Sequence, residues 1–172
     1  MTTNIQNSVW TPVENLEKNC FGCGNENAHG LQMIFETNGT ELRSTVQVPE
    51  RFRGWSNLIH GGVLSTILDE VMGWTAILFT RKFMLTRKMN IEFQKPVRVD
   101  AVLTATARIK EQRSERRATV IAEIRDQQND ICVISEGEFA LFTPEQFRRM
   151  RILSDSDLDA LLQAHPELDE IK

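Results

Sequence analysis

The stretch "LIHGGVLSTILDEVMGWTAI", residues 58–77, is apolar over most of its length, opens on His-Gly-Gly and carries Asp-Glu at its centre. Its apolar residues recur at three- and four-residue spacing, which predicts an α-helix. The bulky residues share one stripe of that helix: Leu64, Ile67, Val71, Trp74 and Leu78. The opposite stripe is small: Gly62, Thr66, Asp69, Gly73 and Ala76. Because an unpartnered charge inside a helix is costly, the Asp69-Glu70 pair needs a structural or a chemical reason.

Alternating apolar and polar residues predict strands on both sides of this helix. Before it, two runs at 31–35 and 42–48 are joined by Asn38-Gly39, a typical hairpin turn. After it, four alternating runs fall at 89–94, 101–109, 118–124 and 131–141. A helix that is apolar over most of its circumference must be covered by such a sheet. We therefore expect an α+β fold in which an antiparallel sheet wraps around one long central helix.

The two ends of the chain read as extensions of this single domain. Residues 1–19 form a polar arm, with a short helical piece near 12–18, and the core covers about 20–142. The tail at 143–172 predicts two helices. The first starts at Thr143-Pro-Glu-Gln, a capping-box pattern, and the second starts at Ser154 and stops before Pro166.

Composition restricts the classes of partner and compartment. The 20 Lys and Arg stand against 24 Asp and Glu, which argues against a nucleic-acid-binding protein. The odd number of cysteines, three, and the absence of an apolar leader predict a cytoplasmic protein. The longest apolar segment is interrupted by Asp69 and Glu70, so we expect no membrane span.

The start of the central helix has the properties of an anion site. Gly61 and Gly62 place unpaired backbone N–H groups at the positive end of the helix dipole. Asp69 lies seven residues after Gly62, about 10 Å along the axis, too far for one chain to hold one carbonyl group at both points. Two antiparallel copies of the helix could bring them together, which predicts a homodimer or a homotetramer built from it. Spacing alone leaves a purely structural role for Asp69, His60 and the glycines equally open.

The segments "HGGVLSTILDEVMG" (60–73), "MNIEFQKPV" (89–97) and "CFGCGNENAHGLQM" (20–33) resemble the hotdog-fold acyl-CoA thioesterases of the PaaI-like group. The matching features are the His-Gly-Gly helix start, an acidic residue nine positions after the His, and the following strand that ends in Pro. The resemblance covers roughly residues 20–142. It implies hydrolysis of an acyl-CoA thioester to free acid and coenzyme A, without a metal or another cofactor.

Carried over by position, the resemblance implies that Gly61 and Gly62 donate N–H groups to the thioester carbonyl oxygen. Asp69 of the other subunit acts as general base or nucleophile, and His60 orients the carbonyl. Thr86 matches a Ser/Thr position that helps to hold the hydrolytic water. Many relatives have an Asn six residues before the His; here that position is Gly54, and Asn57 is the nearest substitute.

Other polar residues have weaker assignments. Arg87 and Lys88, in a basic cluster with Arg81 and Lys82, could contact the coenzyme A phosphates. Glu70 is the rival carboxylate, at an angle that would let it reach solvent or an Arg.

The cysteine-rich segment invites a zinc interpretation. Cys20, Cys23 and His29 are zinc-ligand types, but a structural zinc site normally has four ligands, and Cys132 falls in a distant strand. The sequence therefore predicts no metal.

Two rival functions remain. A hotdog domain could bind acyl-CoA without hydrolysing it, although a carboxylate beside the thioester is then superfluous. A hotdog dehydratase or hydratase would use a His and an acidic residue in other sequence settings. No GxSxG nucleophile elbow is present in the sequence.

Overall fold

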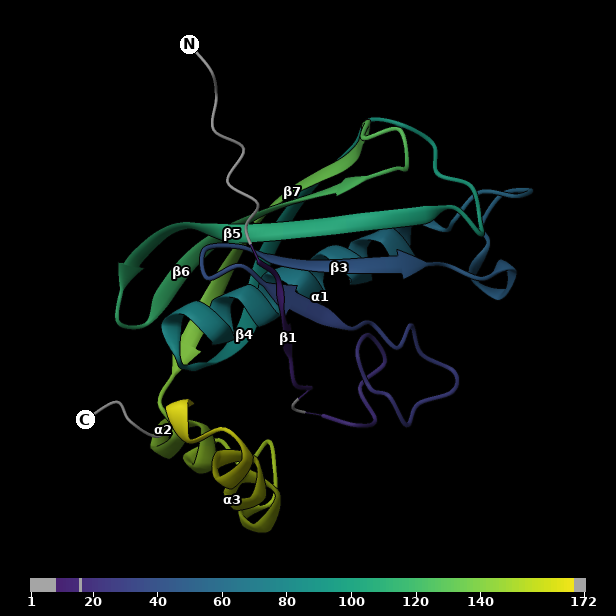
Figure 1. Cartoon of the computed structure of the whole chain (residues 1–172). Helices are drawn as coiled ribbons and strands as arrows, with labels where there is room; N and C mark the ends of the chain where they lie inside the picture. Colours follow the sequence, from purple (N-terminus) through teal and green to yellow (C-terminus); the bar gives the residue numbers. More distant parts are fainter. Residues whose placement is uncertain (1–8, 16, 169–172) are drawn as a thin grey trace.

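In the computed structural model, which describes residues 9–15 and 17–168, one antiparallel sheet of seven strands curves around a long helix (Figure 1). The helix is α1 (Gly61–Thr80). The strands are β1 (Thr11–Val13), β2 (Phe35–Thr37), β3 (Leu42–Gln47), β4 (Phe83–Phe93), β5 (Val102–Ser114), β6 (Arg117–Arg125) and β7 (Ile131–Phe142). They lie in the order β1-β2-β3-β5-β6-β7-β4, so β1 and β4 are the two edges. This arrangement confirms the predicted α+β hotdog fold.

Helix α1 forms the centre of the hydrophobic core. Ile67 and Val71 on its bulky stripe have no exposed surface, and Leu64 and Trp74 are at most 6% exposed. They pack against inward-facing residues of the sheet, which are alanines or branched aliphatic residues: Leu103, Ala105, Val120, Ala122, Ile124 and Val133. Small residues on the sheet let the helix approach closely, and the alternation in β5–β7 produces this face.

Length and hydropathy alone would allow α1 to cross a membrane, since its best 18-residue window has a mean hydropathy of 1.4. However, 56% of that window is buried inside the protein. Core packing under the sheet therefore accounts for the apolar character of this helix.

The N-terminal segment differs from its prediction. Instead of a helical piece near 12–18, residues Thr11–Val13 form β1, which pairs antiparallel with β2. A tripeptide around Pro12 can extend an edge strand, because its missing N–H need not face a partner. The sheet thus begins before residue 20.

Three other strands also have different bounds. Strand β5 continues five residues past its predicted end at 109, and β2 and β4 differ at their starts. The predicted strand at 31–35 is only Phe35–Thr37, because Gln32 has a left-handed backbone (φ 50°). Leu31 and Met33 instead donate their N–H groups to the carbonyls of Phe21 and Gly22. In contrast, β4 begins six residues before the predicted start, because its first half pairs with β7 despite its charged residues.

The C-terminal tail follows the prediction. Helix α2 (Pro144–Arg149) starts with a complete capping box between Thr143 and Gln146. Helix α3 (Asp155–Ala164) is capped by Ser154 and is followed by a short 3₁₀ turn, η2 (Pro166–Leu168). The tail packs on the end of the hotdog through a small second cluster centred on Phe83, which stacks on Phe147 at 4.5 Å between ring centroids.

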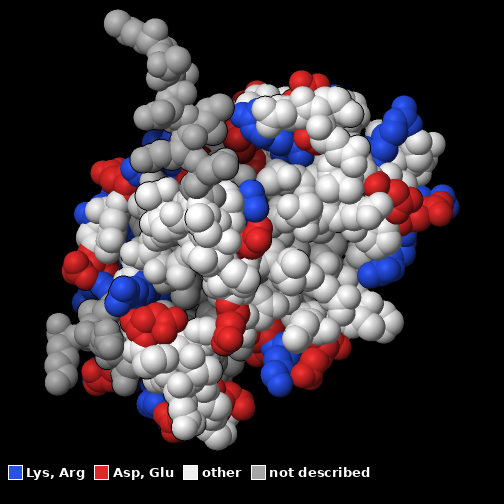
Figure 2. Space-filling model, in the orientation of Figure 1, with Lys and Arg blue, Asp and Glu red and all other residues white. Residues whose placement is uncertain are grey.

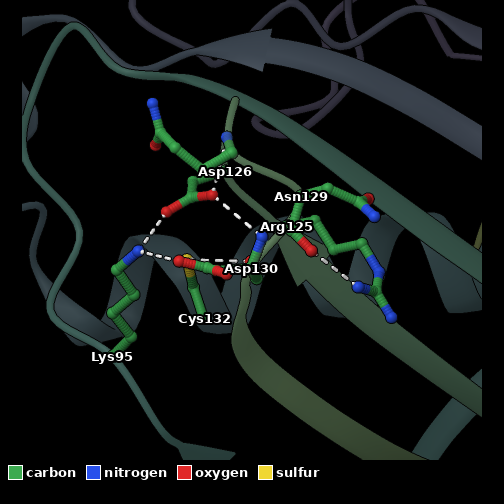
Figure 3. Close-up of polar contacts among 7 residues, drawn as sticks. Lys95, Arg125, Asp126, Asn129, Asp130 and Cys132 are labelled. Atoms are coloured by element: carbon green, nitrogen blue, oxygen red, sulfur yellow. Dashed lines mark hydrogen bonds and ion pairs between the residues drawn. The ribbon is translucent and has the colours of Figure 1, made fainter.

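Ion pairs connect the end of β4 to the turn between β6 and β7. Lys95, just after β4, contacts carboxylates of Asp126 and Asp130 in the β6–β7 turn at 2.5 and 2.8 Å (Figure 3). On the face shown in Figure 2, basic and acidic side chains are interspersed around the rim.

Candidate active site

The start of α1 is held by its own histidine. His60 is the N-cap residue, and its Nδ1 accepts the N–H of Gly62 at 2.9 Å. The neutral ring therefore carries its proton on Nε2, where it can donate a hydrogen bond. The N–H of Gly62 is thus already paired. Of the glycine pair at the start of α1, Gly61 is the residue whose N–H has no acceptor among the described residues. The structure thus narrows the predicted pair of glycine donors to Gly61, with the His60 ring beside it.

Asp69 and Thr86, predicted to share the site, are in direct contact. The Thr86 hydroxyl on β4 donates to Oδ1 of Asp69 at 2.8 Å. Asp69 is half-buried on α1 and Thr86 is exposed. The hydrogen bond fixes one carboxylate oxygen and leaves the other for a water molecule or a substrate. A Thr at this position can therefore orient the carboxylate itself, and not only a water molecule.

Helix α1 and strand β4 run side by side in opposite directions. A Cβ at Gly61 would lie 3.5 Å from the ring of Phe93, at the end of β4. At the other end, Gly73 leaves room for the Met84 side chain, which a Cβ would overlap. Asp69 and Thr86 lie between these contacts. Gly61 and Asp69 therefore lie beside the same edge strand, Gly61 at its C-terminal end and Asp69 nearer to its N-terminal end.

The predicted substrate-binding residues are at the surface. Asn57 is exposed and its carbonyl accepts the N–H of Val99. Gly54 packs against the backbone of His60, so the position that is Asn in many relatives here serves a tight loop. Arg87 and Lys88 are both exposed on β4, at a β-bulge between Thr86 and Lys88.

Arg87 has basic neighbours that the sequence analysis missed. It lines a hollow of about 390 Å³ together with Arg116, Arg117 and Arg149. Arg149 also pairs with Glu145. These arginines come from β4, the β5–β6 connection, the start of β6 and α2, so no local pattern in the sequence could have grouped all of them.

Glu70 is not where its helical angle suggested. Instead of reaching solvent or an Arg, its Oε1 accepts a hydrogen bond from the Cys20 thiol at 3.3 Å. Burial, followed by the charge of Cys20, raises the pKa of Glu70 to about 7. The hydrogen bond between Cys20 and Cys23 lowers the pKa of the first thiol and raises that of the second. Glu70 therefore belongs to a cysteine cluster and not to the Asp69 site.

A separate hollow lies away from these residues. It has a volume of about 730 Å³ and lies on strands β4–β7, around Asn90, Thr106, Ile121 and Glu136. None of the candidate catalytic residues lines it. In one chain, Asp69 and Gly61 both lie beside the edge strand β4.

Part of the sequence matches a known protein family. The sequence profile of the thioesterase superfamily matches residues 56–133, which include α1 and β4. No curated protein sequence matches the chain.

Several solved structures share the fold. A thioesterase superfamily protein is 27% identical, with a TM-score of 0.66 over 72% of this chain and 60% of that one. This chain thus spans three fifths of that relative's length. The Escherichia coli PaaI protein, from the phenylacetic acid degradation operon, is 22% identical, with a TM-score of 0.55 over 59% of this chain and 72% of that one.

A third structure was solved with a ligand. The Streptococcus mutans protein smu.793, bound to acetyl-CoA, is 16% identical, with a TM-score of 0.56 over 59% of this chain and 81% of its own. The chain thus shares with PaaI the hotdog fold, a sheet wrapped around one long helix, and its residues 56–133, with α1 and β4, are similar to the thioesterase superfamily.

Proposed function

We propose that this protein hydrolyses acyl-CoA thioesters to a free acid and coenzyme A, in the cytoplasm. The observation that carries the proposal is the Asp69 carboxylate, oriented by Thr86, on an edge strand whose far end, at Phe93, lies close to Gly61. A thioester is already activated, so a carboxylate and an oxyanion site suffice for its hydrolysis. The superfamily match and the acetyl-CoA bound to the S. mutans relative support this substrate class.

The active form we propose is a homodimer, alone or within a homotetramer. Strand β4 is eleven residues long and lies at the sheet edge, with Leu85 and Phe93 exposed by 38% and 53%. A long edge with exposed apolar residues is prone to pair with another strand. Antiparallel pairing of two β4 strands about their midpoint would place the Phe93 end of one against the Thr86 end of the other. Gly61 of the partner subunit would then face Asp69.

The proposed chemistry follows from that juxtaposition. The thioester carbonyl oxygen accepts hydrogen bonds from the N–H of Gly61 and from Nε2 of His60. Asp69 either takes a proton from water as the water attacks the carbonyl carbon, or attacks that carbon itself. Negative charge then develops on the carbonyl oxygen at the positive end of α1, where the helix dipole stabilises it. Collapse of the tetrahedral intermediate breaks the C–S bond and expels the coenzyme A thiolate, which takes up a proton, from Asp69 in the general-base route. In the nucleophilic route a water molecule then hydrolyses the acyl-Asp69 anhydride, which releases the free acid and restores the carboxylate.

The arginine hollow is the site we propose for the coenzyme A phosphates. Guanidinium groups bind phosphate oxygens in a bidentate manner, and four of them line this hollow. Arg87 follows Thr86 directly, which places the hollow next to the carboxylate along β4. Arg87→Glu is therefore expected to raise KM for acyl-CoA at least about tenfold, with a smaller effect on kcat. Lys88 and Asn57 are weaker candidates for substrate contacts.

The decisive experiment measures thiol release from short, long and aromatic acyl-CoAs by the wild type and by Asp69→Asn. We expect the wild type to hydrolyse at least one of these and the variant to lose most of that rate. Asp100→Asn makes the same chemical change at an exposed residue between β4 and β5, and should retain full activity. Calorimetric binding of the same acyl-CoAs without turnover by the wild type would contradict the proposal and favour an acyl-CoA-binding module.

A further inference from the structure

A second cluster of reactive side chains lies where the N-terminal loop crosses α1. Cys20 and Cys23 come from the turn "CFGCG" (20–24), and Glu70 comes from the middle of the helix. The two sulfur atoms and a carboxylate oxygen all lie within 4.8 Å of one another. Neither cysteine is in a disulfide. Nothing in the proposed hydrolysis uses this cluster.

The geometry matches metal ligation. Zn–S bonds of about 2.3 Å and Zn–O bonds of about 2.1 Å put the sulfur and oxygen ligands of a tetrahedral ion about 3.6 Å apart. Cys20 Sγ and Glu70 Oε1 are 3.3 Å apart before any ion is considered. The two ligand atoms would therefore have to separate by only about 0.3 Å to bind the same ion.

Both sulfur atoms also accept N–H groups. The backbone N–H of Gly22 points at Cys20 Sγ at 3.3 Å, and the indole N–H of Trp74 points at Cys23 Sγ at 3.4 Å. Such outer contacts orient ligands and stabilise thiolate charge. A sulfur that accepts N–H donors is prepared to be a thiolate, the form that binds a metal.

The charge around the cluster is uncompensated. Within the described part of the chain, no Lys or Arg forms an ion pair with Glu70. Asp69, the next residue, adds a further carboxylate nearby. Partly buried acidic groups of this kind are normally paired with a cation or coordinate a metal. A divalent cation would neutralise two of the three negative charges that the ligand set carries when it is deprotonated.

Glycine keeps the loop against the helix. A Cβ on residue 22 would overlap Cγ and Cδ of Glu70, and one on residue 24 would overlap the backbone of Cys20. The close approach of the Cys20–Cys23 turn to Glu70 thus depends on two residues that have no side chain. The two glycines therefore allow the loop to contact the Glu70 carboxylate directly.

We propose that Cys20, Cys23 and Glu70 bind one Zn²⁺ ion per chain, with a water molecule as the fourth ligand. The third protein ligand is Glu70, which is distant in the sequence, and not His29, the zinc-ligand type that the sequence offered next to the cysteines. His29 is exposed and outside the cluster. The ion would tie the loop at 20–24 to the helical turn that carries Asp69. Its role is to hold the structure of that turn, not to react with the thioester.

The first test measures metal content and spectrum in the full chain. Protein purified without chelators should contain about one Zn²⁺ per chain by mass spectrometry of the metals, as a single ligand set requires. Replacement by Co²⁺ under reducing conditions should give thiolate-to-cobalt charge-transfer bands and the visible bands of a tetrahedral ion. Zn²⁺ should also protect Cys20 from alkylation, and removing it with a chelator should lower Tm.

Three variants and a matched control locate the site. Cys20→Ser, Cys23→Ser and Glu70→Gln should each weaken Zn²⁺ binding, measured against a chelating dye, at least about tenfold, because even outer-shell losses cost that much. Cys132→Ser should bind Zn²⁺ as the wild type does. Cys132 is also buried, but it lies beside Asp130 at the β6–β7 turn (Figure 3). Circular dichroism checks that each variant is folded.

Several results would overturn the proposal. One is reduced wild-type protein that gives no charge-transfer band and no protection of Cys20 at saturating Zn²⁺. Another is a Cys132→Ser variant that loses binding as strongly as Cys20→Ser. A third is a Cys20–Cys23 disulfide in the purified protein that yields free thiols but no metal binding after reduction. Because none of these measurements uses a thioester, the zinc proposal and the hydrolase proposal can fail separately.

Discussion

At the scale of single residues, Thr86 is the group that holds the proposed catalytic carboxylate. Thr86→Val keeps the shape of the side chain but removes the hydroxyl that donates to Asp69. Hydrogen bonds to charged groups contribute about 1.5–3 kcal/mol, so we expect kcat to fall about 10- to 100-fold. KM should change little. Steady-state thiol release measures both constants.

Thr86→Ser is the control for that substitution, because it restores the hydroxyl on a smaller side chain and should recover most of the rate. Equal kcat values for the wild type and Thr86→Val would mean that Asp69 needs no orientation from β4, or has no part in the reaction.

The N–H of Gly61 can be removed with little change to the fold. Gly61 is the first residue of α1, where Pro is favoured, and His60 already has φ −63° and ψ 135°, which suit a residue before Pro. Gly61→Pro should therefore stay folded while losing the oxyanion donor. Loss of one such donor typically lowers kcat by about 100- to 1,000-fold, and thiol release should show this.

Gly61→Ala is the matched control for the proline variant. It adds the same Cβ next to the Phe93 ring but keeps the N–H, so its rate should stay close to that of the wild type. If both variants are equally impaired, crowding against Phe93 and not the missing donor explains the loss.

From the sequence, single site residues could be predicted only where they belong to one local pattern, such as the spacing along a helix. His60, Gly61 and Asp69 sit on one helix, so their spacing was informative. Thr86 was a candidate only through the family resemblance, as a group that holds the hydrolytic water; its contact with Asp69 was not predicted, because no periodicity links a strand to a helix. Glu70 was misplaced for the opposite reason: its partner, Cys20, lies fifty residues away, and nothing local indicates that the loop folds back onto α1.

At the scale of elements, period alone predicted α1 and β5–β7, because each has one face in the core. Strand β1 was missed because three residues around a proline carry no alternation. The first half of β4 was missed because charged residues at an edge conceal the alternation, while pairing with β7 still makes it a strand. Tertiary pairing, and not propensity, decides such segments.

Lys95 gives a test of how the strand ends are held together. Its ammonium group bridges Asp126 and Asp130 and so joins the end of β4 to the β6–β7 turn (Figure 3). The hydrogen bond from Lys95 lowers the pKa of Asp126 below its ordinary 3.8. The resulting stabilisation is present above that pH and is lost as the pH falls through the lowered value. Lys95→Met should therefore have a lower Tm than the wild type at pH 7, and the difference should vanish toward pH 2.

Thermal melts by circular dichroism between pH 7 and pH 2 measure this difference. Lys88→Met removes an exposed Lys on the same strand and should show no such pH-dependent gap. A Tm difference for Lys95→Met that stays constant with pH would mean that the lysine stem, and not its charge, contributes the stability.

At the scale of the whole molecule, the two halves of the proposed site lie toward opposite ends of β4, and the proposed dimer would bring them together. This predicts that two inactive variants complement each other. Asp69→Asn supplies a normal Gly61, and Gly61→Pro supplies a normal Asp69, so a mixed dimer has one intact site and one doubly damaged site.

With random pairing about half of the dimers are mixed, so co-expressed variants carrying different tags should recover about a quarter of wild-type activity per chain. Sequential purification on both tags should raise this to about half, since every dimer is then mixed. If each chain holds its own complete site, mixing restores nothing, and the role proposed for the β4 edge is wrong. Recovery would instead explain both the exposed edge strand and the distance between Gly61 and Asp69 along α1 by one cause: the active site forms between subunits.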